Sequence, residues 1–261
     1  MAASLNPIIT LTTDFGQSDG YVGAMQGVIL NICPSAKIIH LTHSIAPQNI
    51  WAGAFVLYQA FSYYPSHAVH CVVIDPGVGS ERRAVAVETR QGLFVGPDNG
   101  VLSLALAETT IRQAVALTNP IFQSQKVSAT FHGRDVFAPV AAHLAKGVPI
   151  ETLGEPVTDL VQLEFRTDLE AGQSRVIHVD HFGNVVLDLR AQDLPDPTAV
   201  TFTSGNTTIT SLSRTFADVA EGELLAYVGS SRDHIEIAMR NGNAARALDL
   251  QQGDVVQIAW E

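Results

Sequence analysis

The first 150 residues alternate short apolar runs with longer segments whose apolar residues recur at helical spacing. The runs at 7–14, 36–43 and 67–75 have the length and content of buried strands. Between them, the segments at 19–34 and 47–64 have the periodicity of helices, and a proline opens the second of them. A further helix is expected over 133–147, where a glycine closes it. Strands that alternate with helices of this length predict a largely parallel sheet covered on both faces.

The chain changes character near residue 165, where short strands separated by turns replace the alternation. A small β-barrel or sandwich is the natural interpretation of that pattern. We therefore predict an α/β fold with an N-terminal α/β domain (1–165), whose sheet is mostly parallel, and a C-terminal small β-barrel-like domain (173–261). The polar segment 163–173 is the expected linker.

The composition excludes several classes of protein. Fifteen basic and 26 acidic side chains give a net charge of −11, which argues against nucleic-acid binding. Cys33 and Cys71 lie in apolar runs, so both are expected to be reduced core thiols. Neither a signal-like start nor an apolar run of about 18 residues is present. We expect a cytoplasmic protein without a membrane segment.

Four polar clusters interrupt the first domain, and most of them follow predicted strands or open predicted helices. They read "TTDFGQSDGY", "IDPGVGSERR", "VGPDNG" and "TFHGRD". Ligands of open α/β sheets bind at the carboxyl ends of the strands, so the clusters predict a site at that edge. In the second cluster, Asp75 and Arg82 are expected to pair across a tight loop.

Each cluster also has a purely structural interpretation. Asp14 resembles a cap or turn residue, and His132 could be a structural histidine beside a local pair of Arg134 and Asp135. A protein kinase is excluded, because the "DFG" lacks the other kinase motifs. A dinucleotide-binding loop is disfavoured, because Arg82 stands at the position of the third glycine of that motif. A metal is disfavoured, since "HVDH" (178–181) is the closest approach to a ligand cluster among 9 histidines.

The polar motifs taken together resemble a known family. "TTDFGQSDGYVGAMQG", "HSIAPQNIWAG", "VVIDPGVGSERRAVAVET", "FVGPDNGVLS", "TFHGRDVFAPVAAHLA", "VDHFGNVVLDL" and "SSRDHIEIAMRNGNAA" resemble the S-adenosyl-L-methionine hydroxide adenosyltransferases, relatives of the fluorinase and chlorinase. The resemblance covers nearly the whole chain. It implies an enzyme that hydrolyses S-adenosylmethionine to adenosine and L-methionine without a metal or other cofactor. It also implies a homotrimer whose sites lie between subunits.

The resemblance assigns site residues by motif. The implied catalytic residues are Asp75, Arg82 and His132. The implied substrate contacts are Asp14 for the ribose, Asp19 and Asp180 for the methionine amino group, Ser231 and Arg232 for its carboxylate end, and Phe182 and Asn184 for adenine. Simple barrel core remains the alternative for Phe182.

The implied chemistry leaves some questions open. Either His132 or Asp75 could accept the proton of the attacking water. The loop with Asp75 and Arg82 differs from the halogenase loop, and Gln48 replaces a fluorinase-type tryptophan, so both features favour hydroxide over halide. Met239 and Arg240 depart from the family pattern near the adenine pocket. A non-catalytic protein that binds adenosine or S-adenosylmethionine is the alternative from another class.

Overall fold

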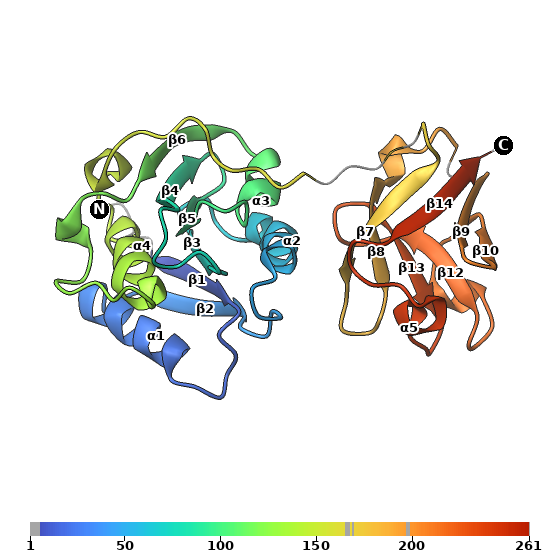
Figure 1. Cartoon of the computed structure of the whole chain (residues 1–261), viewed down its shortest axis with the longest axis horizontal. Coiled ribbons are helices and arrows are strands. Elements are labelled where there is room, and N and C mark those ends of the chain that lie inside the picture. Colours follow the sequence, from blue (N-terminus) through green and yellow to red (C-terminus); the bar gives the residue numbers. More distant parts are fainter. Residues whose placement is uncertain (1–5, 165–167, 169, 197–198, 261) are drawn as a thin grey trace. The chain divides into compact units, whose positions relative to one another are not determined.

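Figure 1 shows the computed structural model of the chain, which describes residues 6–164, 168, 170–196 and 199–260. The chain divides into two units, Met1–Leu163 and Glu164–Glu261, each with an apolar core of its own. Part of the expected linker, residues 165–167 and 169, lies outside the described residues.

The first unit is built on a six-stranded sheet with the order β2-β1-β3-β5-β4-β6. β1 pairs in parallel with β2 and β3, and β3 pairs in parallel with β5, whereas β4 runs antiparallel to β5 and β6. The strands are β1 (Ile8–Thr13), β2 (Lys37–Thr42), β3 (Val69–Val73), β4 (Ala84–Thr89), β5 (Leu93–Pro97) and β6 (Ile111–Ala116). The predicted α/β domain with a mostly parallel sheet is confirmed.

Helices cover both faces of this sheet (Figure 1). α1 (Tyr21–Ile32) and α4 (Ala138–Ala145) pack on one face, and α2 (Ile50–Ala60) and α3 (Ser103–Ala107) pack on the other. The side chains of the central strand β3 alternate between these two faces. Val69, Cys71 and Val73 pack in the core with α1 and α4, whereas Val72 packs in the core with α2 and α3. All four are buried, and so is His70 between them, so the strand is buried at every position rather than alternating between buried and exposed residues.

Two helix starts differ from the sequence prediction. α2 begins at Ile50 rather than at residue 47, because Gln48 has a φ of +66° and cannot belong to a right-handed helix. Asn49 caps α2 instead, accepting from the amide of Ala52 at 2.9 Å. The helix predicted from residue 133 begins as a π-helical turn, η3 (Gly133–Phe137), before it continues as α4.

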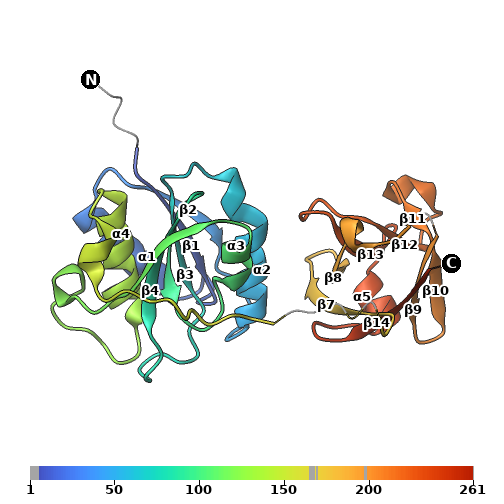
Figure 2. The ribbon, with the colours of Figure 1, turned by 90° about the horizontal axis from the view of Figure 1, so that it is seen from above.

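The second unit is an eight-stranded sheet that curls into a barrel-like arrangement, as predicted (Figure 2). Its order is β10-β9-β14-β7-β8-β13-β12-β11. The strands are β7 (Gln173–Val179), β8 (Val185–Arg190), β9 (Val200–Ser204), β10 (Thr207–Thr210), β11 (Leu212–Ser213), β12 (Leu224–Val228), β13 (His234–Met239) and β14 (Val255–Trp260). The short helix α5 (Ala244–Leu248) was not predicted.

Both cysteines are free and buried, as expected from the apolar runs around them. Burial raises the pKa of the Cys71 thiol to about 12. Among the helices in the described part of the chain, none is long and apolar enough to cross a membrane.

Candidate active site

Three loops that carry polar residues leave the same edge of the first sheet. β1, β2 and β3 run parallel, and Asp14, His43 and Asp75 follow their carboxyl ends. This is the edge at which open α/β sheets bind ligands. The first two polar clusters noted in the sequence therefore share one end of the first unit.

The Arg82 guanidinium joins Asp75 to His132. Its Nε donates to Asp75 Oδ1 at 2.8 Å, and its Nη2 donates to Asp75 Oδ2 at 2.5 Å. The same Nη2 lies 2.7 Å from His132 Nδ1, on a loop 50 residues farther along the chain. The predicted pairing of Asp75 with Arg82 is confirmed. The two side chains are only 5% and 11% exposed, so removing one partner would cost about 3–5 kcal/mol.

Arg82 also determines which nitrogen of His132 carries the proton. A guanidinium has only donors, so His132 Nδ1 must accept, and the neutral ring keeps its proton on Nε2. Burial lowers the pKa of His132, and the charge of Arg82 lowers it further, whereas Asp75 and Asp135 act in the opposite direction. His132 is therefore a neutral imidazole whose Nε2 is a hydrogen-bond donor.

Close packing holds the loop of Asp75 against the segment that leads to His132. Gly79 has a φ of +78°, and a Cβ there would lie 2.5 Å from the carbonyl oxygen of Ala129. Just beyond His132, Asp135 accepts from the amide of Ser128 at 2.8 Å and from Arg134 Nε at 2.7 Å. The predicted local pair of Arg134 and Asp135 is confirmed. Its bond to Ser128 ties the loop before His132 to the π-helical turn η3.

Asp14 is held by a backbone amide from a loop 34 residues away. The amide of Gln48 donates to Asp14 Oδ2 at 2.7 Å. Gln48 has a positive φ of +66°, which costs about 1–3 kcal/mol for a residue other than glycine. Backbone strain of this kind clusters at ligand-binding sites.

A chain of hydrogen-bonded side chains ends at Thr13, the residue before Asp14, and it was not predicted from the sequence. Gln26 Nε2 lies 2.8 Å from His40 Nε2, His40 Nδ1 lies 2.5 Å from His43 Nε2, and His43 Nδ1 lies 2.8 Å from Thr13 Oγ1. Burial, followed by the neighbouring His40, lowers the pKa of His43 to about 4. The chain ties α1, β2 and the end of β1 together. The three-residue spacing in "HLTH" was its only signal.

Aromatic rings connect the loop after β1 with the loop of His132. The rings of Phe15 and Tyr21 each lie against Phe131, with centroids 5.8 and 5.2 Å apart. Asp19 lies between Phe15 and Tyr21 in the sequence, on an exposed loop where the Ser18 hydroxyl donates to it at 3.4 Å.

A cavity of about 680 Å³ in the second unit brings Phe182 and Asn184 together. Phe182 is 72% exposed, so the interpretation of this residue as barrel core is wrong. The other lining residues are Phe216, Met239, Asn241, Gly242, Asn243 and Arg246. Met239 was identified from the sequence as a departure near the adenine pocket, but Phe216, Asn243 and Arg246 were not identified. Phe216 lies in a separate 3₁₀ turn, and Asn243 and Arg246 lie at the start of α5, which was not predicted.

Asp180 shapes the loop that presents these two residues. Its Oδ1 accepts from the amides of Phe182 and Asn184 at 2.9 and 2.8 Å, and its Oδ2 accepts from Asn184 Nδ2 at 2.8 Å. Such a turn is the usual structural use of an aspartate.

The described residues contain no group of three or more His, Cys, Asp or Glu side chains that could hold a metal.

We expect Gly183→Ala to destabilise the second unit by about 1–3 kcal/mol more than Gly222→Ala. Both glycines have positive φ, but a Cβ at Gly183 would lie 2.1 Å from Asn243, whereas Gly222 faces open space. Asn243 would have to move, and it caps α5 through the amide of Arg246 at 2.7 Å. Urea unfolding followed by Trp260 fluorescence, in a Trp51→Phe background, measures the difference. Equal losses would contradict this packing.

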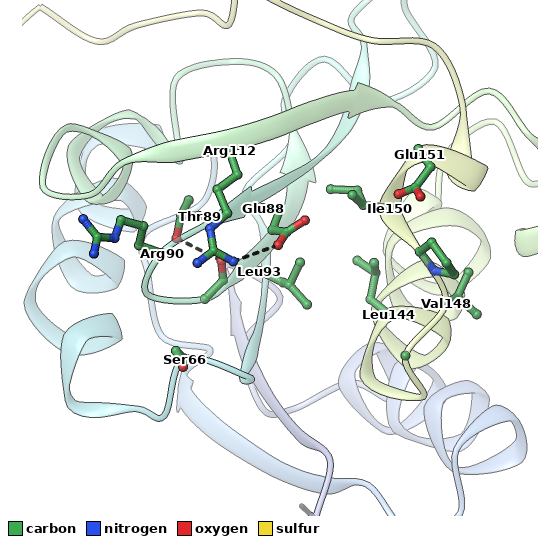
Figure 3. A pocket seen from close by; sticks show the side chains of 13 residues that line it. Ser66, Glu88, Thr89, Arg90, Leu93, Arg112, Leu144, Val148, Ile150 and Glu151 are labelled. Carbon is green, nitrogen blue, oxygen red and sulfur yellow. Dashed lines mark hydrogen bonds and ion pairs between the residues drawn. The ribbon is translucent and has the colours of Figure 1, made fainter.

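A separate cavity of about 370 Å³ lies at the opposite end of the first sheet (Figure 3). Its wall includes Ser66, which precedes β3, and Leu93, which begins β5, whereas Asp75 follows the other end of β3. Figure 3 shows Arg112 paired with Glu88 in this wall, at 3.2 Å. This cavity is therefore not part of the cluster around Arg82.

Two family models match the chain in succession. The model of the SAM hydroxide adenosyltransferase N-terminal domain matches residues 9–154, and that of the C-terminal domain matches residues 174–257. Together they span most of both units.

Individual proteins are similar over nearly the whole chain. An (R)-S-adenosyl-L-methionine hydrolase of Salinispora tropica is 43% identical over 97% of both chains. A fluorinase of Nocardia brasiliensis is 28% identical over 97% of this chain and 96% of its own. The crystal structure of an uncharacterized conserved protein from Thermotoga maritima superposes with a TM-score of 0.89 at 35% identity, over 96% of this chain and all of the other. The chain belongs to the SAM hydroxide adenosyltransferase family.

Proposed function

We propose that the protein hydrolyses S-adenosyl-L-methionine to adenosine and L-methionine. The observation that carries the proposal is the linked set of Asp75, Arg82 and His132 at the ligand-binding edge of the first sheet. It is supported by the relative from Salinispora tropica, which is named as a hydrolase of the (R) form of the same compound. The reaction needs no cofactor.

The chemistry is a displacement at C5′ of the ribose. The oxygen of water forms a bond to C5′ while the bond from C5′ to sulfur breaks, and the electron pair goes to sulfur. The leaving group is a neutral thioether, so it needs no general acid. Water is a weak nucleophile, however, and it has to be aimed in line with the breaking bond. The site must therefore make hydroxide available and hold it in place.

His132 and Arg82 stabilise that nucleophile in our proposal. His132 cannot accept a proton at Nδ1 while Arg82 occupies it, and its Nε2 already carries one. The ring therefore donates from Nε2 to the oxygen of the water or hydroxide, and Arg82 supplies positive charge beside it. Asp75 fixes the plane of Arg82 through its two hydrogen bonds. The proton of the water passes to solvent.

The remaining predicted residues bind the substrate. Asp14 accepts from the ribose hydroxyls, Phe182 and Asn184 hold adenine by packing and hydrogen bonding, and Asp19 and Asp180 face the ammonium group. Ser231 and Arg232 contact the carboxylate of the methionine end. The candidates are divided between the two units of the chain. We propose a cytoplasmic homotrimer whose sites lie between subunits, as the family resemblance implies, and light scattering would measure its mass against 27.9 kDa for one chain.

We expect incubation in ¹⁸O-labelled water to give adenosine with one labelled oxygen at the 5′ position, together with unlabelled methionine. Attack of water at C5′ puts the oxygen of the solvent on the ribose and nowhere else. Mass spectrometry of both products, with each sulfonium epimer supplied separately, measures the position of the label and the preferred epimer.

Parallel incubations with fluoride or chloride separate the competing functions. A halogenated adenosine in place of labelled adenosine would show a halogenase. Binding of the substrate without any product would show a binding protein. Label in methionine would contradict attack at C5′.

A further inference from the structure

Glu236 is a buried carboxylate in the second unit to which the proposed chemistry gives no task. It lies on β13 and is 6% exposed. Tyr227 lies directly opposite on β12, and its hydroxyl donates to Glu236 Oε2. A buried carboxylate costs several kcal/mol unless its oxygens are hydrogen-bonded, so a simple core position would be better filled by an apolar residue.

The turn between β12 and β13 is built on this carboxylate. A Cβ at Gly229 would lie 2.1 Å from Glu236 Oε1, so the backbone approaches the carboxylate as closely as only glycine allows. The hydroxyl of Ser231 also hydrogen-bonds to Glu236. Arg232 and Asp233 follow with φ values of +54° and +61°. Two successive non-glycine residues with positive φ persist only where neighbouring contacts hold the turn.

Tyr227, the hydrogen-bond partner of Glu236, also contacts the wall of the 680 Å³ cavity. The Tyr227 ring packs on Phe216, with centroids 5.1 Å apart and the planes 55° apart. Phe216 lines the 680 Å³ cavity that also contains Phe182 and Asn184. One pair of hydrogen-bonded side chains therefore contacts both the turn of Ser231 and the wall of this cavity.

The local charges agree with this geometry. Burial raises the pKa of Glu236, and the nearby negative charge of Asp180 raises it further, whereas the hydrogen bonds from Tyr227 and Ser231 lower it. Burial, followed by the hydrogen bond to Glu236, raises the pKa of Tyr227. The hydrogen bonds from Tyr227 and Ser231 therefore offset the burial of this carboxylate, so its position depends on these two partners.

We propose that Glu236 and Tyr227 are positioning residues for recognition of the amino-acid end of the substrate. They act through the turn that presents Ser231 and Arg232, and they need not touch the substrate themselves. This inference rests on the proposed function, because it assumes that Ser231 and Arg232 contact the methionine end. The inference adds that Glu236 and Tyr227 hold the turn of Ser231 and Arg232 in its binding conformation before the substrate binds.

The test compares two ligands that differ only in the amino-acid end. S-Adenosylhomocysteine has this end but no sulfonium, so it cannot be turned over by the proposed route, and adenosine lacks the end altogether. We expect Glu236→Ala to weaken the binding of S-adenosylhomocysteine about 10-fold in calorimetry, while the Kd of adenosine changes less than about 3-fold. The KM of S-adenosylmethionine rises with it, while kcat changes little.

Glu236→Gln distinguishes hydrogen bonding from charge. Its amide oxygen accepts from Tyr227, and its NH2 donates to Ser231, so it should restore the Kd to within about 3-fold of the wild type. Glu223→Ala is the matched control, since Glu223 lies in the exposed turn that enters β12 and accepts from the amide of Ala220 at 2.7 Å. If Glu236→Ala does not fold, Tyr227→Phe should show the same selective loss to a smaller extent.

Three results would overturn the inference. These are a Glu236→Ala variant that binds S-adenosylhomocysteine like the wild type, one that loses both ligands equally, and a Glu236→Gln variant as weak as Glu236→Ala. A wild-type protein that binds adenosine but not S-adenosylhomocysteine would instead contradict the proposed substrate.

Discussion

His132→Ala is expected to lower kcat for the hydrolysis of S-adenosylmethionine by about 10²–10⁴-fold, with a smaller change in KM. The variant removes the Nε2 donor from the nucleophile and leaves the guanidinium of Arg82 without the third of its three hydrogen bonds in this cluster. Release of labelled adenosine under single-turnover conditions measures the chemical step directly.

His132→Gln tells a hydrogen-bond donor from a general base. The side-chain amide can present an N–H near the position of Nε2, but it cannot take up a proton. If His132 acts as a donor, the glutamine variant should recover about 10-fold or more of the activity that alanine loses. Equal rates for the two variants would contradict the donor role.

Arg134→Ala is the matched control for this experiment. Arg134 lies two residues from His132, and it pairs with Asp135 rather than with the cluster of Arg82. We expect its effect on kcat to be small beside that of His132→Ala. Wild-type affinity for adenosine in each variant would show that the fold is intact.

The second large effect concerns stability in acid. We expect the free energy of unfolding of the first unit to fall by about 3 kcal/mol between pH 6.5 and pH 4 because of His70 alone. His70 is fully buried, its Nδ1 lies 2.9 Å from Thr10 Oγ1, and its ring stacks on Phe94. Burial lowers the pKa of His70 from 6.5 to about 4.

The direction follows from the number of protons that each state binds. Between pH 6.5 and 4 the unfolded chain protonates His70 while the folded chain keeps it neutral, so the unfolded state gains protons and stability falls as the pH falls. Above pH 6.5 both states are neutral at this residue, and below pH 4 both are charged. His43, which burial affects in the same direction, adds to the slope.

His70→Gln should lose about 3 kcal/mol less unfolding free energy than the wild type between pH 6.5 and pH 4. Any pH-independent effect of the substitution on stability does not change this difference. Urea unfolding at several pH values, followed by the fluorescence of Trp51 in a Trp260→Phe background, measures it for the first unit. His181→Gln, at an exposed position of the second unit, is the matched exchange. An unchanged slope in His70→Gln would show that His70 is not the group that titrates.

Local patterns in the sequence were sufficient for the strands and for one contact of the site. The run 67–75 is apolar at every position of β3 except His70, and such a run predicts a strand buried on both faces, as β3 is. Asp75 and Arg82 lie at the two ends of one glycine-containing loop, and their pairing needs no information from elsewhere in the chain. The same holds for Arg134 and Asp135, which are neighbours in the chain.

Contacts between distant segments were not predictable in the same way. Gln48 looked like part of a helix because its neighbours have helical periodicity, yet its amide turns towards Asp14 on another loop. The chain from His40 through His43 to Thr13 depends on the parallel register of β1 and β2. Neither the positive φ of Gln48 nor this register can be predicted from the residues next to it in the sequence, because both depend on contacts with distant segments.

The sequence by itself determined the order of the strands along the chain, the division into an α/β part and a β part, and which polar residues stand at strand ends, because periodicity and turn residues act over short distances. Only the tertiary structure decided that Arg82 bonds to His132 Nδ1 and leaves the proton on Nε2, and that Glu236 is buried beneath the turn of Ser231. Protonation states and buried hydrogen bonds depend on desolvation and on partners from other segments, and these exist only once the chain has packed.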